Sequence, residues 1–178
     1  MTVVGVVAAS GGGVEALREG LVQPLLNDGY QVAVTLTPTA AHWLDQIGEV
    51  ARLSEVTKLP VRSAPRLPSE GRSHPKIDVY VGAPLTANST AKLALGIADN
   101  QALTTLCENV ATTPMVIFPR VNAAHARQPA WAGHIAALQA AGVELIYGED
   151  VWPLMEPRAA GPRDLPWSAI LSAIKSHV

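Results

Sequence analysis

Small hydroxyl, amide and glycine residues follow two apolar runs of this sequence, at places where they could bind a phosphorylated ligand. The first group is Ser10-Gly11-Gly12-Gly13, which follows the apolar residues 3–9. The second is residues 84–89, Pro-Leu-Thr-Ala-Asn-Ser, which follow the mostly apolar residues 77–81. Both runs indicate buried parallel strands, and a helical pattern follows each polar turn. Helix N-terminal amides beyond the carboxyl ends of such strands commonly bind phosphate groups.

Each polar turn also has a purely structural interpretation. The three glycines do not have the Gly-x-Gly-x-x-Gly spacing of a dinucleotide site, and they could serve only a tight strand-to-helix turn. Residues 84–89 could be no more than the capped start of a helix. Thr37 and Thr39 lie at the carboxyl end of another predicted strand, and they too could bind a ligand or cap the next helix.

Apolar runs alternate with helical patterns along the chain, which predicts the α/β fold class. We expect a single domain of residues 1–178 with a Rossmann-like doubly wound parallel sheet, a three-layer α/β/α arrangement and strand order 3-2-1-4-5-6. Strands are predicted at residues 3–9, 31–37, 61–63, 77–81, 115–118 and 143–146. Helices are predicted at residues 14–26, 38–44, 87–100, 130–141 and 167–171.

Composition narrows the partners and the compartment. The 178 residues carry a net charge of −2, so the chain has no electrostatic footprint for nucleic acid or for an anionic membrane. No apolar run is long enough to span a bilayer and no basic leader is present, which predicts a cytoplasmic protein with a small-molecule or peptide ligand. Cys107 is the only cysteine, which excludes an intrachain disulfide, and we expect no metal site.

Residues 84–89 are similar to the signature of a known family. Pro84-Leu85-Thr86-Ala87-Asn88-Ser89 resembles the Pro-Ala-Ser-Ala-Asn-Thr signature of the homo-oligomeric flavin-containing cysteine decarboxylases, and the likeness continues through residues 91–100. This family includes phosphopantothenoylcysteine decarboxylase, the peptidyl-cysteine decarboxylases and, more distantly, flavin prenyltransferase. The chain is one residue longer than the family form directly after Asn100, so the resemblance indicates a divergent member.

The resemblance implies an FMN cofactor, which would be bound at turns that follow neighbouring strands. The site would be shared between subunits of a homo-oligomer, either a trimer or a dodecamer built from trimers. The residues that the resemblance implies for FMN binding are Ser10, Gly11, Gly12, Gly13, Thr37, Thr39, Pro84, Thr86, Ala87, Asn88 and Ser89.

Asn122 is the residue for which the resemblance implies a contact with substrate. The family pattern is Pro-x-Met-Asn-x-x-Met, and its Asn holds the substrate carboxylate. Asn122 matches this Asn, while Val121 and His125 replace the two methionines. An amide can hold a carboxylate without protonating it, which suits a step that releases carbon dioxide. His125 could act as an acid or base, or it could only fill the space of a methionine.

The catalytic histidine of the family falls on a different residue here. Counting back from Pro84 without gaps gives Glu70, and His74 is the only histidine in residues 58–74. His74 could supply the base from a shifted position, or it could be an exposed loop residue. We therefore expect Asn122 to orient the substrate and either His74 or His125 to manage the proton.

The implied reaction is oxidative decarboxylation of a cysteine-type thiol carboxylate, either a small molecule or a peptide C-terminus. The thiol would be oxidised to a thioaldehyde by hydride transfer to the flavin, and loss of carbon dioxide would give an enethiol. One alternative is an FMN-binding regulatory or carrier protein without chemistry of its own, and another is a flavin prenyltransferase-like enzyme. The family members of coenzyme A biosynthesis carry a flap cysteine, and the absence of any cysteine after Cys107 disfavours their reaction.

Overall fold

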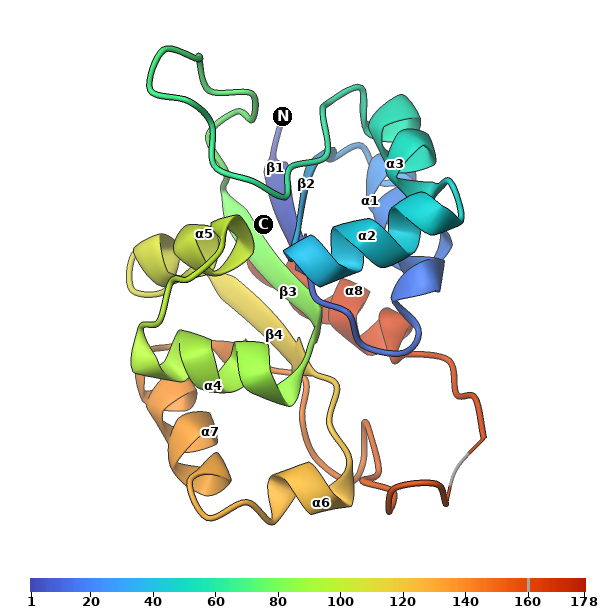
Figure 1. Ribbon diagram of the computed structural model, residues 1–178, viewed down its shortest axis with the longest axis vertical. Coiled ribbons are helices and arrows are strands. Elements are labelled where there is room, and N and C mark those ends of the chain that lie inside the picture. Colours follow the sequence, from blue (N-terminus) through green and yellow to red (C-terminus); the bar gives the residue numbers. More distant parts are fainter. Residues whose placement is uncertain (160) are drawn as a thin grey trace.

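Five parallel strands form one sheet in the computed structural model, which describes residues 1–159 and 161–178 (Figure 1). The strand order is β2-β1-β3-β4-β5, and each pair of neighbours is parallel. The carboxyl ends of the strands therefore lie at one edge, and the predicted fold class is confirmed. The strands are β1 Val3–Ala8, β2 Gln31–Leu36, β3 Val79–Leu85, β4 Met115–Pro119 and β5 Glu144–Leu145.

The predicted strand at residues 61–63 is reduced to a single bridge on the outer side of β2. Arg62 pairs in parallel with Thr35, and its amide and carbonyl make backbone hydrogen bonds to β2 of 3.0 and 2.7 Å. Pro60 and Pro65 flank this bridge and lack a backbone N–H, which prevents a longer ladder. With the bridge counted as the third strand, the sheet has the predicted order 3-2-1-4-5-6.

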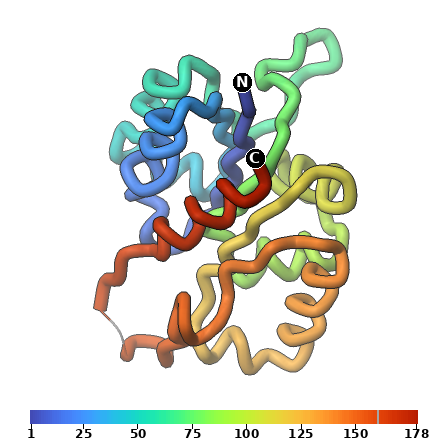
Figure 2. Tube along the Cα trace, turned by 180° about the vertical axis from the view of Figure 1, so that it is seen from behind, coloured from blue at the N-terminus to red at the C-terminus, as the bar shows by residue number. Residues whose placement is uncertain are grey.

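Helices cover both faces of the sheet, because successive strand residues point to opposite sides. On one face η2, α1, α2, α3 and α8 pack against Val4 and Val6, and on the other face α4, α5 and α7 pack against Val7. Figure 2, from behind, shows α8 crossing the sheet. Within the described residues, no helix is both long and apolar enough to cross a membrane. The helices are η1 Val14–Ala16, η2 Arg18–Val22, α1 Gln23–Asn27, α2 Pro38–Gln46, α3 Glu49–Thr57, α4 Ala87–Leu95, α5 Gln101–Asn109, α6 Ala123–Ala126, α7 Trp131–Ala140 and α8 Trp167–Lys175.

The helix predicted over residues 87–100 ends earlier, at Leu95, and a separate helix, α5, begins after Asn100. α4 ends where Gly96 takes a φ of 70°, a left-handed conformation that favours glycine. α5 begins after Asn100, whose side-chain oxygen accepts a hydrogen bond from the Leu103 amide at 3.0 Å. The glycine stop and the asparagine cap together turn the chain between the two helices.

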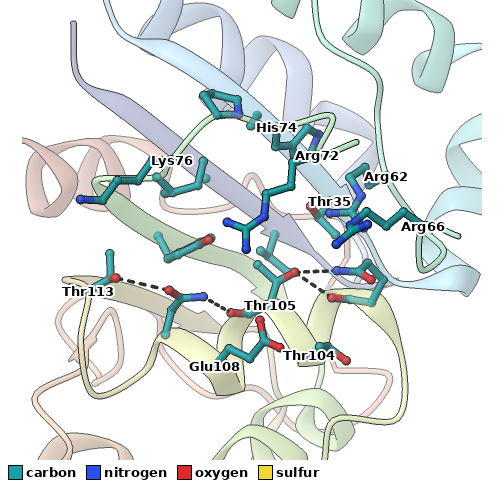
Figure 3. A pocket seen from close by; sticks show the side chains of 18 of the residues that line it. Thr35, Arg62, Arg66, Arg72, His74, Lys76, Thr104, Thr105, Glu108 and Thr113 are labelled. Carbon is teal, nitrogen blue, oxygen red and sulfur yellow. Dashed lines mark hydrogen bonds between the residues drawn. The ribbon is translucent and has the colours of Figure 1, made fainter. Parts of the chain in front are cut away.

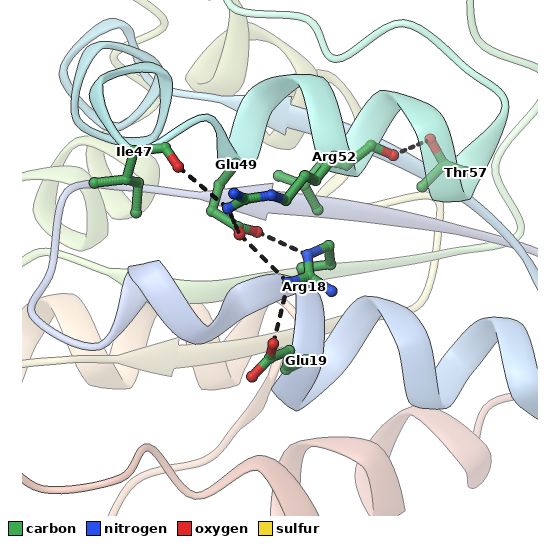
Figure 4. A network of polar contacts seen from close by, with 7 residues as sticks. Arg18, Glu19, Ile47, Glu49, Arg52 and Thr57 are labelled. Carbon is green, nitrogen blue, oxygen red and sulfur yellow. Dashed lines mark hydrogen bonds and ion pairs between the residues drawn. The ribbon is translucent and has the colours of Figure 1, made fainter.

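The buried carboxylate of Glu49, in α3, links this helix to η2 through hydrogen bonds (Figure 4). Glu49 is 6% exposed, and it accepts hydrogen bonds from Arg18 Nε at 2.9 Å and from Arg52 Nη1 at 2.8 Å. Burial raises the pKa of Glu49, but the hydrogen bonds from the two guanidinium groups outweigh this effect and hold the pKa below its usual value.

We expect Glu49→Gln to lower the free energy of unfolding by about 1–2 kcal/mol at neutral pH, because it removes the charge that both arginines share. The folded-state pKa of Glu49 lies below its reference value of 4.5. The stabilisation is therefore fully present above pH 4.5 and is lost as the pH falls through the folded-state pKa. Urea unfolding at a series of pH values measures this difference. Glu19→Gln is the control, because Glu19 also pairs with Arg18 but is 76% exposed, and it should change stability by about 0.5 kcal/mol or less.

Candidate functional site

Backbone hydrogen bonds join the loops that follow β1, β2, β3 and β4. Because all these strands are parallel, the four loops meet at the carboxyl edge of the sheet (Figure 1). The turns singled out in the sequence therefore come together in space. The joining bonds are Ala9 N to Pro84 O at 2.8 Å, Thr37 N to Ala8 O at 2.9 Å and Arg120 N to Leu85 O at 2.8 Å.

The loop after β1 presents free amides beside the loop after β3. Gly11 lies beside the Pro84 ring, with a Cβ position at ordinary contact distance, 3.4 Å from two ring carbons, whereas a Cβ on Gly13 would lie 2.7 Å from the Leu165 side chain. Gly13 takes a φ of 96°, which also favours glycine. Neither the Ser10 amide nor the Gly12 amide donates a hydrogen bond to another residue in the described part of the chain. Two backbone donors are thus available to an anion.

At the start of α4, some of the predicted FMN-binding residues cap the helix, and others have polar groups that remain available to a ligand. Thr86 Oγ1 accepts a hydrogen bond from the Ser89 amide at 3.1 Å and also contacts the Ser89 hydroxyl at 3.2 Å. The Thr86 side chain therefore caps the helix, and the Ser89 hydroxyl packs against this cap. The Ala87 and Asn88 amides belong to the first turn, which has no intrahelical acceptors. Asn88 is exposed, so its side chain and this helix end can face a ligand.

The two threonines after β2 have different environments. Thr37 is 7% exposed, and its hydroxyl accepts a hydrogen bond from the Ala40 amide at 3.3 Å. This geometry is that of the helix cap considered as an alternative. Thr39 is exposed at the start of α2, and its side chain makes no hydrogen bond to a described residue. Thr39 is the more accessible of the two for a ligand.

Asn122 lies at the start of α6 with one half of its amide fixed. Asn122 Oδ1 accepts a hydrogen bond from the His125 amide at 2.9 Å, so the side chain cannot turn freely. Its Nδ2 group donates to no residue in the described ranges, which leaves two N–H donors open. The preceding residue, Val121, is buried in a small apolar cluster, and Ala87 at the start of α4 packs against this cluster. Asn122 therefore lies in a loop beside the start of α4. The His125 side chain is exposed.

Arg120 is a residue of this edge to which the sequence analysis assigned no role. Its Nε donates to the Gly12 carbonyl at 3.3 Å, and its guanidinium lies 5.6 Å from the centre of the Trp152 ring. Arg163 lies 3.5 Å from the same ring, and both burial and the charge of Arg120 lower the pKa of Arg163. The sequence signal that could have identified Arg120 is its position: it is a cation directly after a predicted strand, at the edge of the sheet where the polar turns were expected.

The structure does not bring His74 to Asn122 within one chain. His74 belongs to residues 62–77, which face α5 across β1 and β2 and lead into the amino end of β3, whereas Asn122 follows the carboxyl end of β4 at the start of α6. Its Nε2 is 2.8 Å from the Pro60 carbonyl oxygen. Burial lowers the pKa of His74, and the Arg62 guanidinium lowers it further, although the Pro60 carbonyl acts in the opposite sense. Glu70 is exposed in the same segment.

The groups at the carboxyl edge fit a flavin mononucleotide. A phosphate needs several donors, which the amides of Ser10 and Gly12, the first turn of α4 and the Arg120 guanidinium provide. A ribityl chain needs small polar groups, and Thr39 and Asn88 are exposed nearby. Gly11 lies directly beside Pro84, so the first and third loops are in contact there. The donor set therefore suits a phosphorylated ligand with hydroxyl groups.

Comparison with known proteins gives a family and a fold. Residues 2–177 match the family described as Flavoprotein. Phosphopantothenoylcysteine decarboxylase from Arabidopsis thaliana is 26% identical over 145 residues, which are 79% of this chain and 69% of the relative. The FMN-dependent cysteine decarboxylase TvaF from thioviridamide biosynthesis has a TM-score of 0.69 at 24% identity, over 99% of this chain and 98% of that chain. The FMN binding protein AtHal3 has a TM-score of 0.67 at 21% identity, over 98% and 95%. Since the family match spans almost every residue, the chain belongs to the Flavoprotein family.

Proposed function

We propose that this chain binds FMN at the carboxyl edge of its sheet and catalyses the oxidative decarboxylation of a cysteine-type thiol carboxylate. The substrate would be a small molecule or the C-terminus of a peptide. The observation that carries this proposal is the fixed amide of Asn122. Its oxygen is held by the His125 amide, and its N–H donors are left open for a carboxylate, which can only accept hydrogen bonds.

The residues that would hold FMN are those of the converging loops. Ser10, Gly12 and the first turn of α4 would donate backbone hydrogen bonds to the phosphate, and Arg120 would supply a positive charge beside them. Gly11 and Gly13 would allow the close approach of the backbone. Bound FMN would supply the capacity to accept two electrons from the substrate thiol.

Asn122 would act on the carboxylate by position. Two N–H donors from one rigid amide can hold a carboxylate in a defined orientation, and they leave it ionised as the loss of carbon dioxide requires. The neighbouring Arg120 adds positive charge at the same edge, which favours binding of an anionic substrate. His125 is three residues away on α6 and exposed, so it is the histidine of this edge that could exchange a proton with solvent.

The names of the relatives support this assignment. The curated relative is a decarboxylase of a cysteine-containing substrate, and TvaF is an FMN-dependent cysteine decarboxylase. Both matches extend over most of this chain. We therefore place the same class of chemistry at the edge where Asn122 and the four loops meet.

Two measurements test the proposal in sequence. The first is titration of the purified chain with FMN, in which binding should quench the flavin fluorescence. The second is anaerobic mixing of the FMN-loaded protein with a peptide that ends in cysteine and with a small N-acylcysteine. The visible absorbance of the flavin should fade, and mass spectrometry should show loss of carbon dioxide and two hydrogens. A chain that binds no FMN, or a flavin that stays oxidised with both thiols, would contradict the proposed activity.

A second candidate function is FMN binding without chemistry of the chain's own. It is favoured by Glu70 at the position of the family histidine and by the place of His74, which lines a cavity over β1 and β2 that Asn122 does not line. The FMN binding protein AtHal3 is among the similar structures. The anaerobic experiment separates the two candidates, because a carrier would bind FMN but would not reduce it with any thiol carboxylate.

We also propose that the chain forms a homo-oligomer, with a trimer as its unit. Large apolar side chains are exposed beside the site, with Trp43 at 48% and Ile47 at 50% on and after α2. Light scattering should give about 56 kDa, three times the 18.7 kDa of one chain. The double substitution Trp43→Arg and Ile47→Arg should reduce the measured mass to that of a monomer. Leu67→Arg, at another exposed apolar residue, should leave it unchanged; a wild-type monomer would contradict the proposal.

A further inference from the structure

A cavity of about 660 Å³ lies on the face of the sheet that α5 covers (Figure 3). Its floor is formed by β1 and β2, one wall by α5, and the opposite wall by residues 62–77. None of the residues predicted to bind FMN lines it, and neither does Asn122. The cavity is in the size range of small-molecule sites in proteins. It is therefore a second space, separate from the proposed flavin site.

The wall formed by residues 62–77 carries an excess of positive charge. Arg62, Arg66, Arg72 and Lys76 line the cavity, whereas Glu108 on α5 is its only lining carboxylate. Within residues 1–159 and 161–178, none of these four cations lies in an ion pair. The chain as a whole carries a net charge of −2, so this concentration of cations is local. Like charges held together in one cavity favour a bound anion.

The guanidinium groups keep their donors available to a ligand. Arg66 bonds only to the backbone carbonyls of Leu67 and Glu70, through Nη1. The side chains of Arg62 and Arg72 donate to no described residue, and Figure 3 shows Arg72 extending toward α5. Arginine donors match the oxygens of a phosphate in pairs, which gives affinity and orientation together.

The wall formed by α5 is polar but already satisfied. Thr105 bonds to Gln101, Asn109 bonds to the Thr105 carbonyl, and Thr113 bonds to Asn109, as the dashed lines in Figure 3 show. This wall therefore offers few free groups, and recognition by the cavity would come from its cations. Burial lowers the pKa of His74, and Arg62 lowers it further, so we do not count His74 among those charges.

The floor of the cavity is suited to an uncharged part of a ligand. Gly5 and Ala33 leave space above the strands, and the Tyr80 ring lies across Gly5, where a Cβ would be 2.7 Å from two ring carbons. Thr35 is 4% exposed and its hydroxyl has no hydrogen-bond partner in the described part of the chain. A ligand with a flat or apolar portion could lie over Tyr80 and reach the Thr35 hydroxyl.

We propose that this cavity is a binding site for a small organic phosphate that carries at least two negative charges. Its phosphate oxygens would lie among Arg62, Arg66 and Arg72, with Lys76 beside them, and its uncharged part would lie on the floor over Tyr80. The proposal does not rest on the decarboxylase chemistry, because none of the residues proposed to hold FMN or the substrate carboxylate lines this cavity.

Isothermal titration calorimetry on the FMN-loaded protein tests this site with three probes: inorganic pyrophosphate, ADP and citrate. We expect pyrophosphate and ADP to bind, ADP more tightly because its base can lie on the floor. The double substitution Arg66→Gln and Arg72→Gln should raise both dissociation constants by roughly tenfold or more. FMN affinity should stay within about twofold of wild type, which shows that the variant is folded.

The matched control is Lys58→Gln with Arg158→Gln, which removes two exposed cations that do not line this cavity. It makes the same change in net charge and should leave both dissociation constants within about twofold. An equal loss of affinity in this control would overturn the site, because binding would then depend only on overall charge. Citrate binding as tight as that of pyrophosphate would overturn the assignment to phosphate, and absence of binding by both phosphate probes would overturn the proposal altogether.

Discussion

Asn122→Asp should lower the rate of flavin reduction by a cysteine-ending peptide on the order of 100- to 1000-fold. Aspartate is as good a helix cap as asparagine, so the hydrogen bond from the His125 amide is kept and α6 should fold as before. The open N–H donors, however, are replaced by a negatively charged oxygen. A like charge facing the substrate carboxylate costs several kcal/mol, which corresponds to this loss of rate. Stopped-flow absorbance under anaerobic conditions measures it.

Asn122→Ser separates the effect of the added negative charge from the effect of losing the amide N–H donors. Serine also caps a helix, but it has no amide to reach a carboxylate and adds no charge, so we expect an intermediate loss of roughly 10- to 100-fold. Both variants should bind FMN within about twofold of wild type. His125→Ala keeps the backbone amide that fixes Asn122 and should retain the substrate affinity. If Asn122→Asp reduced the flavin as fast as wild type, the carboxylate would have to be held by another residue.

The positions of the polar turns could be predicted because each depends on local sequence. Apolar runs mark the strands, and parallel strands place their carboxyl ends at one edge whatever the details of packing. The Gly11 turn and the α4 turn therefore came together as expected. Asn122 was singled out by the family resemblance, and its position three residues after the end of β4 places it at the same edge of the sheet. Topology alone was enough to bring these turns together, whereas the roles of single residues came from the resemblance.

The residues that were missed depend on the path of a loop or on contacts between distant segments. Residues 62–77 have no periodic pattern, so nothing local indicated that His74 would line a cavity over β1 and β2, away from Asn122. The cationic cavity forms only because this loop faces α5 across β1 and β2. Arg120 could have been noted as a cation at a strand end, but its contact with Gly12 joins residues 108 positions apart.

The structure was also needed to decide whether single threonines cap a helix or bind a ligand. A hydroxyl at a helix start can cap the helix or bind a ligand, and the sequence is the same in both cases. The hydrogen bonds show that Thr37 and Thr86 cap α2 and α4. This leaves the backbone amides and Asn88 as the groups at the start of α4 that are open to FMN.

Asn88→Asp should raise the dissociation constant for FMN by roughly 30- to 100-fold without destabilising the fold. An acidic residue in the first turn of a helix interacts favourably with the helix dipole, so α4 should be at least as stable as in wild type. The same charge would repel the FMN phosphate, and two unit charges about 6 Å apart at an effective dielectric constant of about 20 repel by about 3 kcal/mol. This energy corresponds to about 100-fold in affinity, and solvent exposure of Asn88 reduces it. Fluorescence titration with FMN measures the change.

The control for this prediction is Asn100→Asp, which makes the same substitution at the start of another helix. Asn100 caps α5 through a hydrogen bond from the Leu103 amide, and aspartate can make the same bond. α5 begins away from the four joined loops, so FMN affinity should stay within about twofold of wild type. The two variants have the same net charge, so a general electrostatic effect on FMN would weaken both equally. Loss of affinity in Asn88→Asp alone would mean that the phosphate lies at the start of α4, whereas an unchanged affinity there would place it elsewhere.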